Sequence, residues 1–373
     1  MKVELLCKNY RGISGLARYV HALQDGLAAL GHSVHCVEPT LPKRIAPLCT
    51  FGRNFNLDIA AFLQTYPITA QWQPNTDIYH LTTQEMGLLL LRPQQARTLV
   101  TVHDILPFTL RQQPHLSELR DPVSQLVYRL AMRGLQKATH LIADSNYTKR
   151  CLETALHIAP KRISVVPLAI DHTLFRPQPV PATFWQRFNL PQNKHLILYV
   201  GSDAPRKNLP RLLAAFQQVR ETFEDALLVK VGAATSAERH ITFMADVERQ
   251  QLTEHVRVFS DVGAAELVWF YNAASVFTFP SLYEGFGLPP LEALACGTPA
   301  VCANTTSLPE VVGDAALLCD PHHSAELADA ICRILASPTL AQHLCQRGID
   351  QASQFTWQRT AQQTYRVYQQ LLA

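Results

Sequence analysis

The sequence predicts an α/β protein built from two Rossmann-like domains, each a doubly wound parallel sheet, that face each other across a cleft. At 373 residues the chain is longer than chains that usually fold around one hydrophobic core, so we expect two domains of about 180 residues each. Short apolar runs alternate with longer amphipathic stretches in both halves, as in βαβ units. The proline-rich segment of residues 175–181 is typical of a linker, and the alternation of apolar runs and amphipathic stretches restarts after it.

In the first half, apolar runs of strand length alternate with stretches of helical periodicity, which predicts a parallel sheet covered on both faces. The strands are expected at Val3–Cys7, Ser33–Val37, Ile78–Leu81, Thr98–Val102, His140–Ala143 and Ile163–Val166. The helices are expected at Gly15–Leu30, Arg120–Ala138 and Asn146–Leu156.

The second half repeats this alternation and ends in three consecutive helices. Its strands are expected at Leu196–Val200, Leu227–Val231, Val256–Phe259, Val276–Phe279, Ala300–Cys302 and Leu317–Cys319. Its helices are expected at Leu209–Thr222, Glu238–Gln251, Glu266–Ala274, Leu291–Ala295, Ser324–Ala336, Pro338–Ala352 and Trp357–Leu372. We therefore divide the chain into domains at 1–178 and 179–355 with a terminal helix at 356–373. The carboxyl ends of the strands, where such sheets bind ligands, are expected to face the cleft.

Composition indicates a globular cytoplasmic protein. Apolar residues make up 47% of the chain and charged residues 17%, and no apolar run approaches the ~20 residues of a membrane span. The first residues, MKVELLCKNYRG, lack the apolar core and cleavage site of a signal peptide. The nine cysteines form no C-x-x-C pair and do not cluster with histidines, so we expect reduced thiols and no structural zinc.

The net charge of +3 is unevenly distributed. Residues 1–178 hold 19 Lys and Arg against 12 Asp and Glu, whereas residues 179–373 hold 14 against 18. A basic first half is compatible with peripheral contact between that domain and an anionic membrane surface. It is equally compatible with an ordinary fluctuation in composition.

Residues 276–299 are the most informative stretch. An apolar run ends at Pro280, a glycine-bearing loop follows, and Pro289-Pro290 opens the next helix, so that Glu284, the backbone of Gly285–Leu288 and Glu292 lie where a strand ends and a helix begins. Backbone N–H groups and the helix dipole make such a junction a phosphate site. Two carboxylates there would be acceptors for sugar hydroxyls, which predicts a nucleotide-sugar site. Alternatively, Glu292 only complements the helix dipole from the first turn and Glu284 is an ordinary loop carboxylate.

Three further strand-to-helix junctions are candidates. Gly12 and Gly15 follow the first strand and let the backbone approach a ligand closely, although a plain turn explains them as well. The G-x-G-x-x-G motif of a nicotinamide site and its acidic partner are absent, which disfavours an oxidoreductase. His103 and Asp104 follow another strand: His103 would donate to a sugar hydroxyl or phosphate, and Asp104 would orient it or accept from a hydroxyl. A satisfied structural histidine is the alternative.

The adjacent Arg206 and Lys207 follow the first strand of the second half and precede a helix. They supply two permanent cations where a diphosphate leaving group would develop charge, a task that can otherwise fall to a metal ion. The alternative is a solvated basic pair. No metal ligand set is predicted.

Together these motifs resemble glycosyltransferase family 4, whose members have the GT-B fold. The resemblance is carried by Arg206-Lys-Asn208, by the run from Pro280 to Glu292 with its Glu-x(7)-Glu spacing, and by Ser307-Leu-Pro-Glu-Val-Val-Gly313. The variant is similar to bacterial mannosyltransferase-like enzymes of O-antigen and capsule assembly. Looser support comes from TVHDILP at 101–107, ADSNYTK at 143–149 and VPLAID at 166–171.

The resemblance implies a retaining hexosyltransferase that needs no metal or other cofactor. The donor would be a nucleotide diphosphate sugar, with mannose and a guanosine diphosphate donor favoured. The acceptor would be a glycan or polyprenyl-linked glycan, and no nucleic-acid partner is expected. The N-terminal domain would bind the acceptor and the C-terminal domain the donor, with the terminal helix crossing back to the N-terminal domain.

The resemblance also assigns roles to matching residues. Arg206 and Lys207 would hold the diphosphate, Glu292 the ribose hydroxyls, and Glu284 the donor sugar and its phosphate. The backbone of Gly285, Phe286, Gly287 and Leu288 would cradle the sugar and phosphate, and Gly12 and Gly15 would close over the diphosphate. The base would be contacted around Val258–Val262. His103 and Asp104 would make contacts on the acceptor side.

Two positions depart from the family pattern. Ser202 stands where many members carry an arginine that binds phosphate, and Ala169 replaces a glycine that is usual before Ile-Asp. A nucleotide-sugar epimerase or hydrolase of the same build stays open as an alternative. A non-catalytic subunit is disfavoured because the carboxylates and cations are all present.

Overall fold

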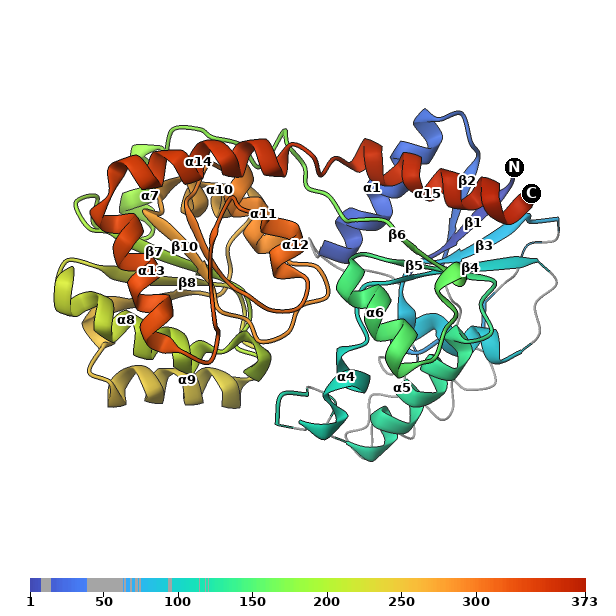
Figure 1. The fold of residues 1–373 in the computed structure, drawn as a ribbon, viewed down its shortest axis with the longest axis horizontal. Coiled ribbons are helices and arrows are strands. Elements are labelled where there is room, and N and C mark those ends of the chain that lie inside the picture. Colours follow the sequence, from blue (N-terminus) through green and yellow to red (C-terminus); the bar gives the residue numbers. More distant parts are fainter. Residues whose placement is uncertain are drawn as a thin grey trace. The chain divides into compact units, whose positions relative to one another are not determined.

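The computed structural model describes residues 1–7, 15–38, 63, 65–67, 69–70, 73, 75–92, 96–113, 115–117, 119 and 121–373. The chain forms two compact units. The first comprises Met1–Ala169 together with Trp357–Ala373, and the second comprises Ile170–Thr356. The terminal helix therefore packs in the first unit, as the sequence predicted (Figure 1).

The first unit contains a six-stranded, all-parallel sheet in the order β2-β1-β3-β4-β5-β6. Its strands are β1 (Val3–Leu6), β2 (Val34–Val37), β3 (Ile78–Leu81), β4 (Arg97–Val102), β5 (His140–Ala143) and β6 (Ile163–Val165). Its α-helices are α1 (Gly15–Ala29), α4 (Leu106–Thr109), α5 (Pro122–Leu135), α6 (Asn146–Ala155) and α15 (Trp357–Leu372). The 3-10 segments are η2 (Gln84–Leu91), η3 (Leu110–Gln112) and η4 (Pro160–Arg162).

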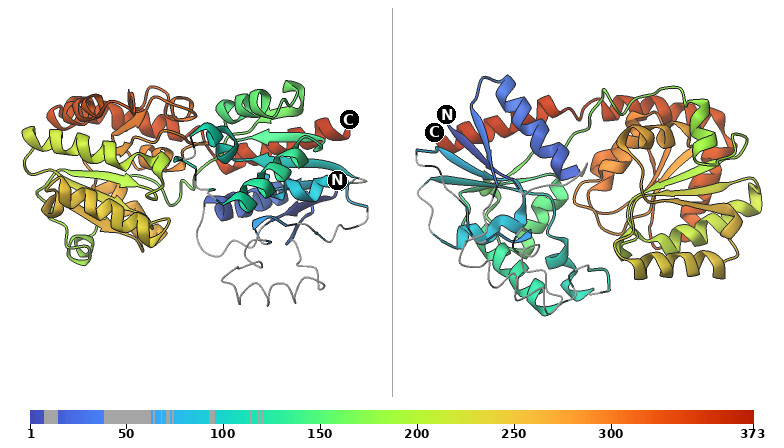
Figure 2. Two further views of the ribbon diagram at one scale, coloured as in Figure 1. Left: turned by 90° about the horizontal axis from the view of Figure 1, so that it is seen from below. Right: turned by 180° about the vertical axis from the view of Figure 1, so that it is seen from behind.

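The core of this unit lies where η2 and α5 cover one face of the sheet, whereas α1 and α15 pack against each other (Figure 2). The contact between α5 and η2 is unusually close. A Cβ built on Gly134 would lie 1.8 Å from the carbonyl oxygen of Gly87, so a side chain there would push the two elements apart.

A buried polar chain anchors α15 in the first unit. The hydroxyl of Tyr368 lies 2.7 Å from Nδ1 of His80, and Nε2 of His80 lies 2.7 Å from the hydroxyl of Thr101. The hydroxyl of Tyr19, on α1, lies 2.8 Å from the same threonine oxygen. Burial lowers the pKa of His80 to about 3, so this imidazole is neutral.

The second unit repeats the architecture with strand order β12-β11-β10-β7-β8-β9, again all parallel. Its strands are β7 (Leu196–Val200), β8 (Leu227–Val231), β9 (Val256–Phe259), β10 (Val276–Phe279), β11 (Ala300–Ala303) and β12 (Leu317–Cys319). Its α-helices are α7 (Ala182–Arg187), α8 (Leu209–Thr222), α9 (Ala237–Arg249), α10 (Ala264–Ala273), α11 (Leu288–Ala295), α12 (Leu308–Val312), α13 (Ser324–Ala336) and α14 (Pro338–Ala352). The 3-10 segments are η5 (Pro205–Lys207) and η6 (Thr253–His255).

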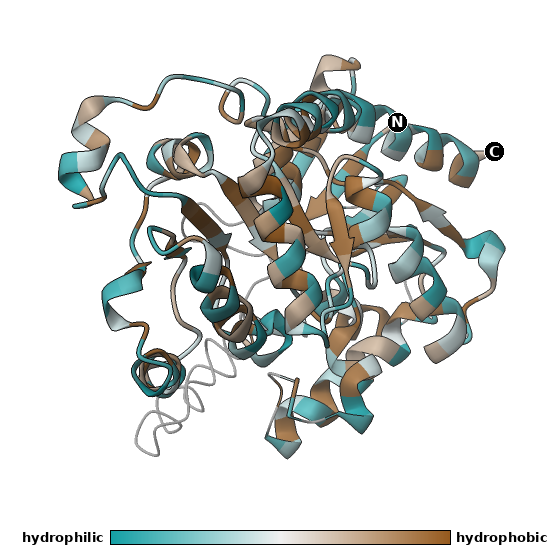
Figure 3. Cartoon of the chain, turned by 60° about the vertical axis from the view of Figure 1, so that its left-hand side comes forward, coloured by the Kyte–Doolittle hydropathy of each residue, from teal (hydrophilic) through white to brown (hydrophobic). Residues whose placement is uncertain are grey.

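The sheet of the second unit lies between two helical layers. Figure 1 shows α8, α9 and α13 on one side and α10, α11 and α14 on the other. Strands β7, β8, β10 and β11 are buried along their whole length, and their sequences are apolar except for Lys230 in β8 and Thr278 in β10. Figure 3 shows strands in the brown of hydrophobic residues and helices of mixed hydropathy.

The α/β class with two parallel sheets is confirmed, but several helix boundaries differ from the predictions. Helix α5 spans Pro122–Leu135 rather than Arg120–Ala138. Helix α11 begins at Leu288, three residues before the predicted start, because Pro289 and Pro290 fit the first helical turn. Glu292 is consequently the fifth residue of the helix, so the proposal that it complements the dipole from the first turn is wrong. Among the described residues, no helix is both long enough and apolar enough to span a bilayer.

Candidate functional site

The sheet of the second unit changes winding direction between β7 and β10. Strand β7 pairs with β8 on one side and with β10 on the other, so the loops after β7 and β10 emerge side by side at the carboxyl edge. The backbone N–H of Leu282 donates to the carbonyl of Arg206 at 2.7 Å and joins the two loops. Such a switch point is where open α/β sheets bind ligands.

Asn208 fixes the end of the loop that follows β7. Its backbone is left-handed, with φ of 61°, a conformation that asparagine tolerates better than most residues. Its side-chain Nδ2 donates to the carbonyls of Pro280 at 3.1 Å and Pro321 at 2.7 Å. Asn208 thereby holds the end of η5, which carries the two predicted cations, against the loop that follows β10.

Arg206, Lys207 and Glu284 form a buried charge cluster across these loops. Lys207 Nζ lies 2.6 Å from Glu284 Oε1, and Arg206 Nη1 lies 3.3 Å from Glu284 Oε2. Lys207 Nζ also lies 4.8 Å from the ring centroid of Phe279. Only 8% of Lys207 and of Glu284 is exposed. The reading of the cations as a solvated basic pair is therefore wrong, since the cluster is preorganised within the protein.

The electrostatics of the cluster keep Glu284 ionised. Burial by itself would raise the pKa of its carboxyl group, but the cations of Lys207 and Arg206 outweigh burial and hold the pKa below its ordinary value. Two cations then face one carboxylate, which gives these three side chains a net charge of one positive unit. That excess charge favours an anionic ligand.

Two side chains that precede α12 form hydrogen bonds with the backbone of the loop after β10. Ser307 Oγ lies 3.1 Å from the carbonyl oxygen of Glu284 and 2.7 Å from that of Phe286. The N–H of Glu284 donates to Thr306 Oγ1 at 3.2 Å. These contacts turn the loop carbonyls toward α12. Sequence reasoning assigned Ser307 no role, although it opens one of the motifs that carry the family resemblance.

Gly287 shapes the phosphate cradle that the sequence predicted. Its φ is 114°, and a Cβ there would lie 2.8 Å from Cδ2 of Leu308, so only glycine fits without strain. Among the described residues, no hydrogen-bond acceptor meets the N–H groups of Phe286, Gly287 and Leu288. Pro289 and Pro290 have no N–H, so the available donors belong to the loop and to the first residue of α11.

The two other predicted donor contacts are Glu292 and Val258. Glu292 is 2% exposed, and its Oε2 accepts from the hydroxyl of Tyr271 at 2.9 Å. Tyr271 packs edge-on against Phe175, and nothing in the sequence signalled its contact with Glu292. Val258 lies half-buried on the edge strand β9. Contacts of Glu292 with ribose and of Val258 with a base stay predictions.

In the first unit, His103 is held by two acceptors at the carboxyl end of β4. Its Nδ1 lies 2.5 Å from Asp144 Oδ2, and its Nε2 lies 2.9 Å from the carbonyl oxygen of Thr82. Burial would lower the pKa of His103, but the charge and hydrogen bond of Asp144 outweigh it and raise that pKa. Because a carboxylate and a carbonyl both accept, we assign protons to both ring nitrogens, which makes this histidine a cation.

The group that orients His103 is Asp144 rather than Asp104. Asp104 Oδ1 instead accepts from the N–H of Leu106, the first residue of α4, at 3.0 Å. Asp144 follows β5 directly, so the rule that found His103 at a strand end would have found it too. Gly15 opens α1, whereas Gly12 lies outside the described residues. No cluster of His, Cys, Asp or Glu that could hold a metal ion occurs in the described part of the chain.

Comparisons with known proteins cover both units. Residues 13–174 match the family described as Glycosyltransferase Family 4, and residues 183–351 match Glycosyl transferases group 1. O-antigen chain mannosyltransferase B of Escherichia coli is 31% identical over 276 residues, which cover 74% of this chain and 71% of the relative. An MMP alpha-(1->4)-mannosyltransferase of Mycolicibacterium hassiacum is 30% identical over 299 residues, covering 77% and 68%.

The fold also matches solved structures along the whole chain. A sucrose-phosphate synthase from Thermosynechococcus elongatus superposes with a TM-score of 0.76 at 24% sequence identity, covering 100% of this chain and 99% of that one. At this identity the match establishes the shared two-domain fold.

Proposed function

The chain belongs to the group 1 glycosyltransferases of family 4, enzymes of the GT-B fold, and from this premise we propose that it is a retaining hexosyltransferase that needs no metal. Its donor is a nucleotide diphosphate sugar, and its acceptor is a glycan or polyprenyl-linked glycan. Mannose is the favoured sugar because two of the similar enzymes are mannosyltransferases.

The observation that carries this proposal is the buried cluster of Arg206, Lys207 and Glu284 beside the N–H groups of Phe286, Gly287 and Leu288, for which the described part of the chain supplies no acceptor. A sugar bound to a nucleotide leaves as a diphosphate, so the developing negative charge needs cations and donors that are already in place. Glu284 fixes both cations before the substrate arrives. We assign Glu284 this positioning task in addition to contact with the donor sugar.

We propose a front-face mechanism with retention of configuration. The bond between the anomeric carbon and the phosphate oxygen breaks first, and the electron pair leaves with the nucleotide diphosphate. The acceptor hydroxyl forms its bond on the same face and transfers its proton to the departing phosphate oxygen. Arg206, Lys207 and the loop N–H groups stabilise the leaving group. Glu284 is not the nucleophile because its carboxylate already binds both cations.

His103 is proposed to act on the acceptor side as a cation. With both ring nitrogens protonated, it cannot serve as a general base, but its charge can stabilise the negative charge that develops on the departing diphosphate. Tyr19 packs edge-on against the imidazole with ring centroids 5.2 Å apart, and together with Asp144 it keeps the ring in one orientation.

We also propose that the enzyme works in the cytoplasm, in peripheral contact with the inner face of the membrane through α5. Val123 and Leu126 on this helix are 63% and 56% exposed, and Arg133 lies two turns further along the same side. Exposed apolar and basic residues on one helix face suit an anionic lipid surface. Cosedimentation with anionic vesicles should fall when Leu126 is replaced by Glu, and equal binding by both proteins would contradict this contact.

Donor identity is tested by thermal shift with a panel of guanosine and uridine diphosphate sugars, followed by NMR of the transfer product. A ligand present at 100-fold its Kd should raise stability by about 2.7 kcal/mol. We expect stabilisation by one nucleotide series and an anomeric configuration in the product that matches the donor. Inverted product would refute retention. Full-rate donor turnover without an acceptor would instead support the hydrolase or epimerase alternative.

A further inference from the structure

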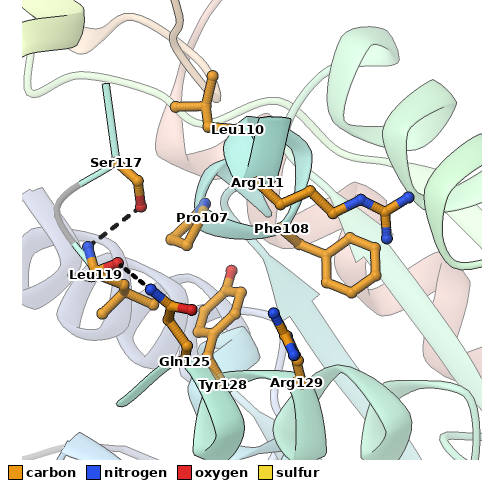
Figure 4. Close-up of a pocket in the computed structure, with 9 residues that line it drawn as sticks. All are labelled: Pro107, Phe108, Leu110, Arg111, Ser117, Leu119, Gln125, Tyr128 and Arg129. Carbon is orange, nitrogen blue, oxygen red and sulfur yellow. Dashed lines mark hydrogen bonds between the residues drawn. The ribbon is translucent and has the colours of Figure 1, made fainter. Parts of the chain in front are cut away.

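The first unit contains a pocket of about 450 Å³ between α4, η3 and α5 (Figure 4). Pro107, Phe108, Leu110 and Leu119 provide apolar walls, and Tyr128, Arg111 and Arg129 provide polar groups. Helix α4 begins three residues after His103, so the pocket wall continues the segment that we place on the acceptor side. The residues to which we assign donor binding and transfer do not line this pocket.

Tyr128 indicates that the pocket takes a polar ligand. The residue is only 4% exposed, and among the described residues no hydrogen-bond partner meets its hydroxyl. Figure 4 shows that hydroxyl directed into the space beside Pro107. A buried hydroxyl without a partner is costly, and a ligand hydroxyl would satisfy it. Burial, with the charges of Asp104 and Glu85, raises its pKa well above the ordinary value, so it stays a hydrogen-bond donor.

The two arginines indicate an anionic group at the other end of the pocket. None of the described carboxylates forms an ion pair with Arg111 or Arg129. The guanidinium carbon of Arg111 lies 5.2 Å from the ring centroid of Phe108, and Figure 4 shows Arg129 on the other side of that ring. Two guanidinium groups suit a dianionic phosphate better than a singly charged carboxylate.

The charges around the pocket therefore fix the orientation of a ligand. Asp104 and Glu85 act on Tyr128 and would repel an anion there, whereas they suit sugar hydroxyls. The phosphate must lie at the arginine end. We propose that this pocket binds a phosphate-bearing sugar, namely the phosphorylated end of the acceptor. This inference rests on the proposed transfer reaction and narrows the acceptor to a sugar phosphate, either free or linked to a prenyl chain.

Isothermal titration of the full-length protein tests the pocket with two probes. Mannose 1-phosphate represents a free sugar phosphate, farnesyl diphosphate represents a prenyl-linked phosphate, and mannose is the neutral control. The donor site is first saturated with whichever of UDP and GDP binds, so that a probe cannot occupy it. We expect at least one phosphate probe to bind and mannose to bind at least tenfold more weakly.

Variants then assign the binding to this pocket. Arg129→Gln and Arg111→Gln should each weaken the bound probe at least tenfold, and Tyr128→Phe should weaken mannose 1-phosphate more than farnesyl diphosphate. Arg150→Gln, an exposed arginine on the neighbouring helix α6, should change the Kd less than twofold. Failure of both probes to bind, or equal binding to wild type and Arg129→Gln, would overturn the pocket assignment.

The same samples separate this inference from the proposed function. If neither UDP nor GDP binds, the donor assignment fails, whereas the comparison of the phosphate probes between wild type and Arg129→Gln still decides the pocket. If the nucleotide binds and the probes do not, the transferase proposal stands and the sugar-phosphate acceptor is rejected. In a transfer assay, Arg129→Gln should raise the KM for the acceptor and leave the KM for the donor unchanged.

Discussion

Lys207 makes the closest ion-pair contact with Glu284 in the proposed donor site, at 2.6 Å. We predict that Lys207→Ala lowers kcat by a factor on the order of 10²–10³, as for removal of one preorganised charge stabiliser. Steady-state kinetics with saturating donor measures the effect. Arg211→Ala, which removes an exposed cation on the adjoining helix α8, is the control and should retain activity. Equal activity of the two variants would contradict the role of Lys207.

The pKa of His103 provides a second prediction. Because Asp144 raises its pKa in the folded state, the stabilisation from this pair is complete below the unfolded value of about 6.5 and is lost as pH rises through the folded value. An NMR titration should find His103 with a pKa above 6.5 in the wild type and a lower one in Asp144→Asn. A pKa of wild-type His103 below its ordinary value would contradict the assignment of a cation.

At the scale of elements, the loop between β10 and α11 depends on one backbone conformation. We predict that Gly287→Ala destabilises the second unit by about 1–3 kcal/mol and abolishes donor binding, because alanine at φ of 114° is strained and its Cβ meets Leu308. Chemical denaturation and nucleotide titration measure the two effects. Gly31→Ala is the control: its φ of 81° is also positive, but nothing lies within 4 Å of the added Cβ. Equal losses in both variants would show that the contact with Leu308 is unimportant.

Sequence patterns predicted the strands and the positions of the two loops after β7 and β10 well because these depend on local chemistry. Apolar runs form the buried strands, and glycine with two prolines marks the start of α11. Contacts between distant segments were not predictable in this way. Asn208 reaches Pro321, and Ser307 reaches the carbonyl of Glu284, through packing that no local pattern encodes. Asp144 was overlooked although it follows a strand, because Asp104 stood next to His103 in the sequence.

Across the whole molecule, the first unit is completed by the last helix of the chain, α15. Tyr368 on α15 satisfies His80 from 288 positions away. We predict that Tyr368→Phe destabilises the first unit by about 1–3 kcal/mol, since the buried Nδ1 of His80 loses its partner. Hydrogen exchange of the β3 and β4 amides measures this loss. Tyr365→Phe, which alters a half-buried tyrosine stacked on His32, should have little effect, and an equal effect would refute the anchoring role.

In the proposed enzyme, Arg206, Lys207 and the N–H groups of Phe286 to Leu288 bind the diphosphate of the donor. A crystal structure with the nucleoside diphosphate that stabilises the protein tests it most directly. We predict phosphate oxygens within hydrogen-bond distance of Lys207 Nζ, of the Arg206 guanidinium and of the N–H groups of Phe286 to Leu288. A diphosphate bound at any other place, with the ion pairs of Glu284 intact and no phosphate beside them, would rule out this binding mode.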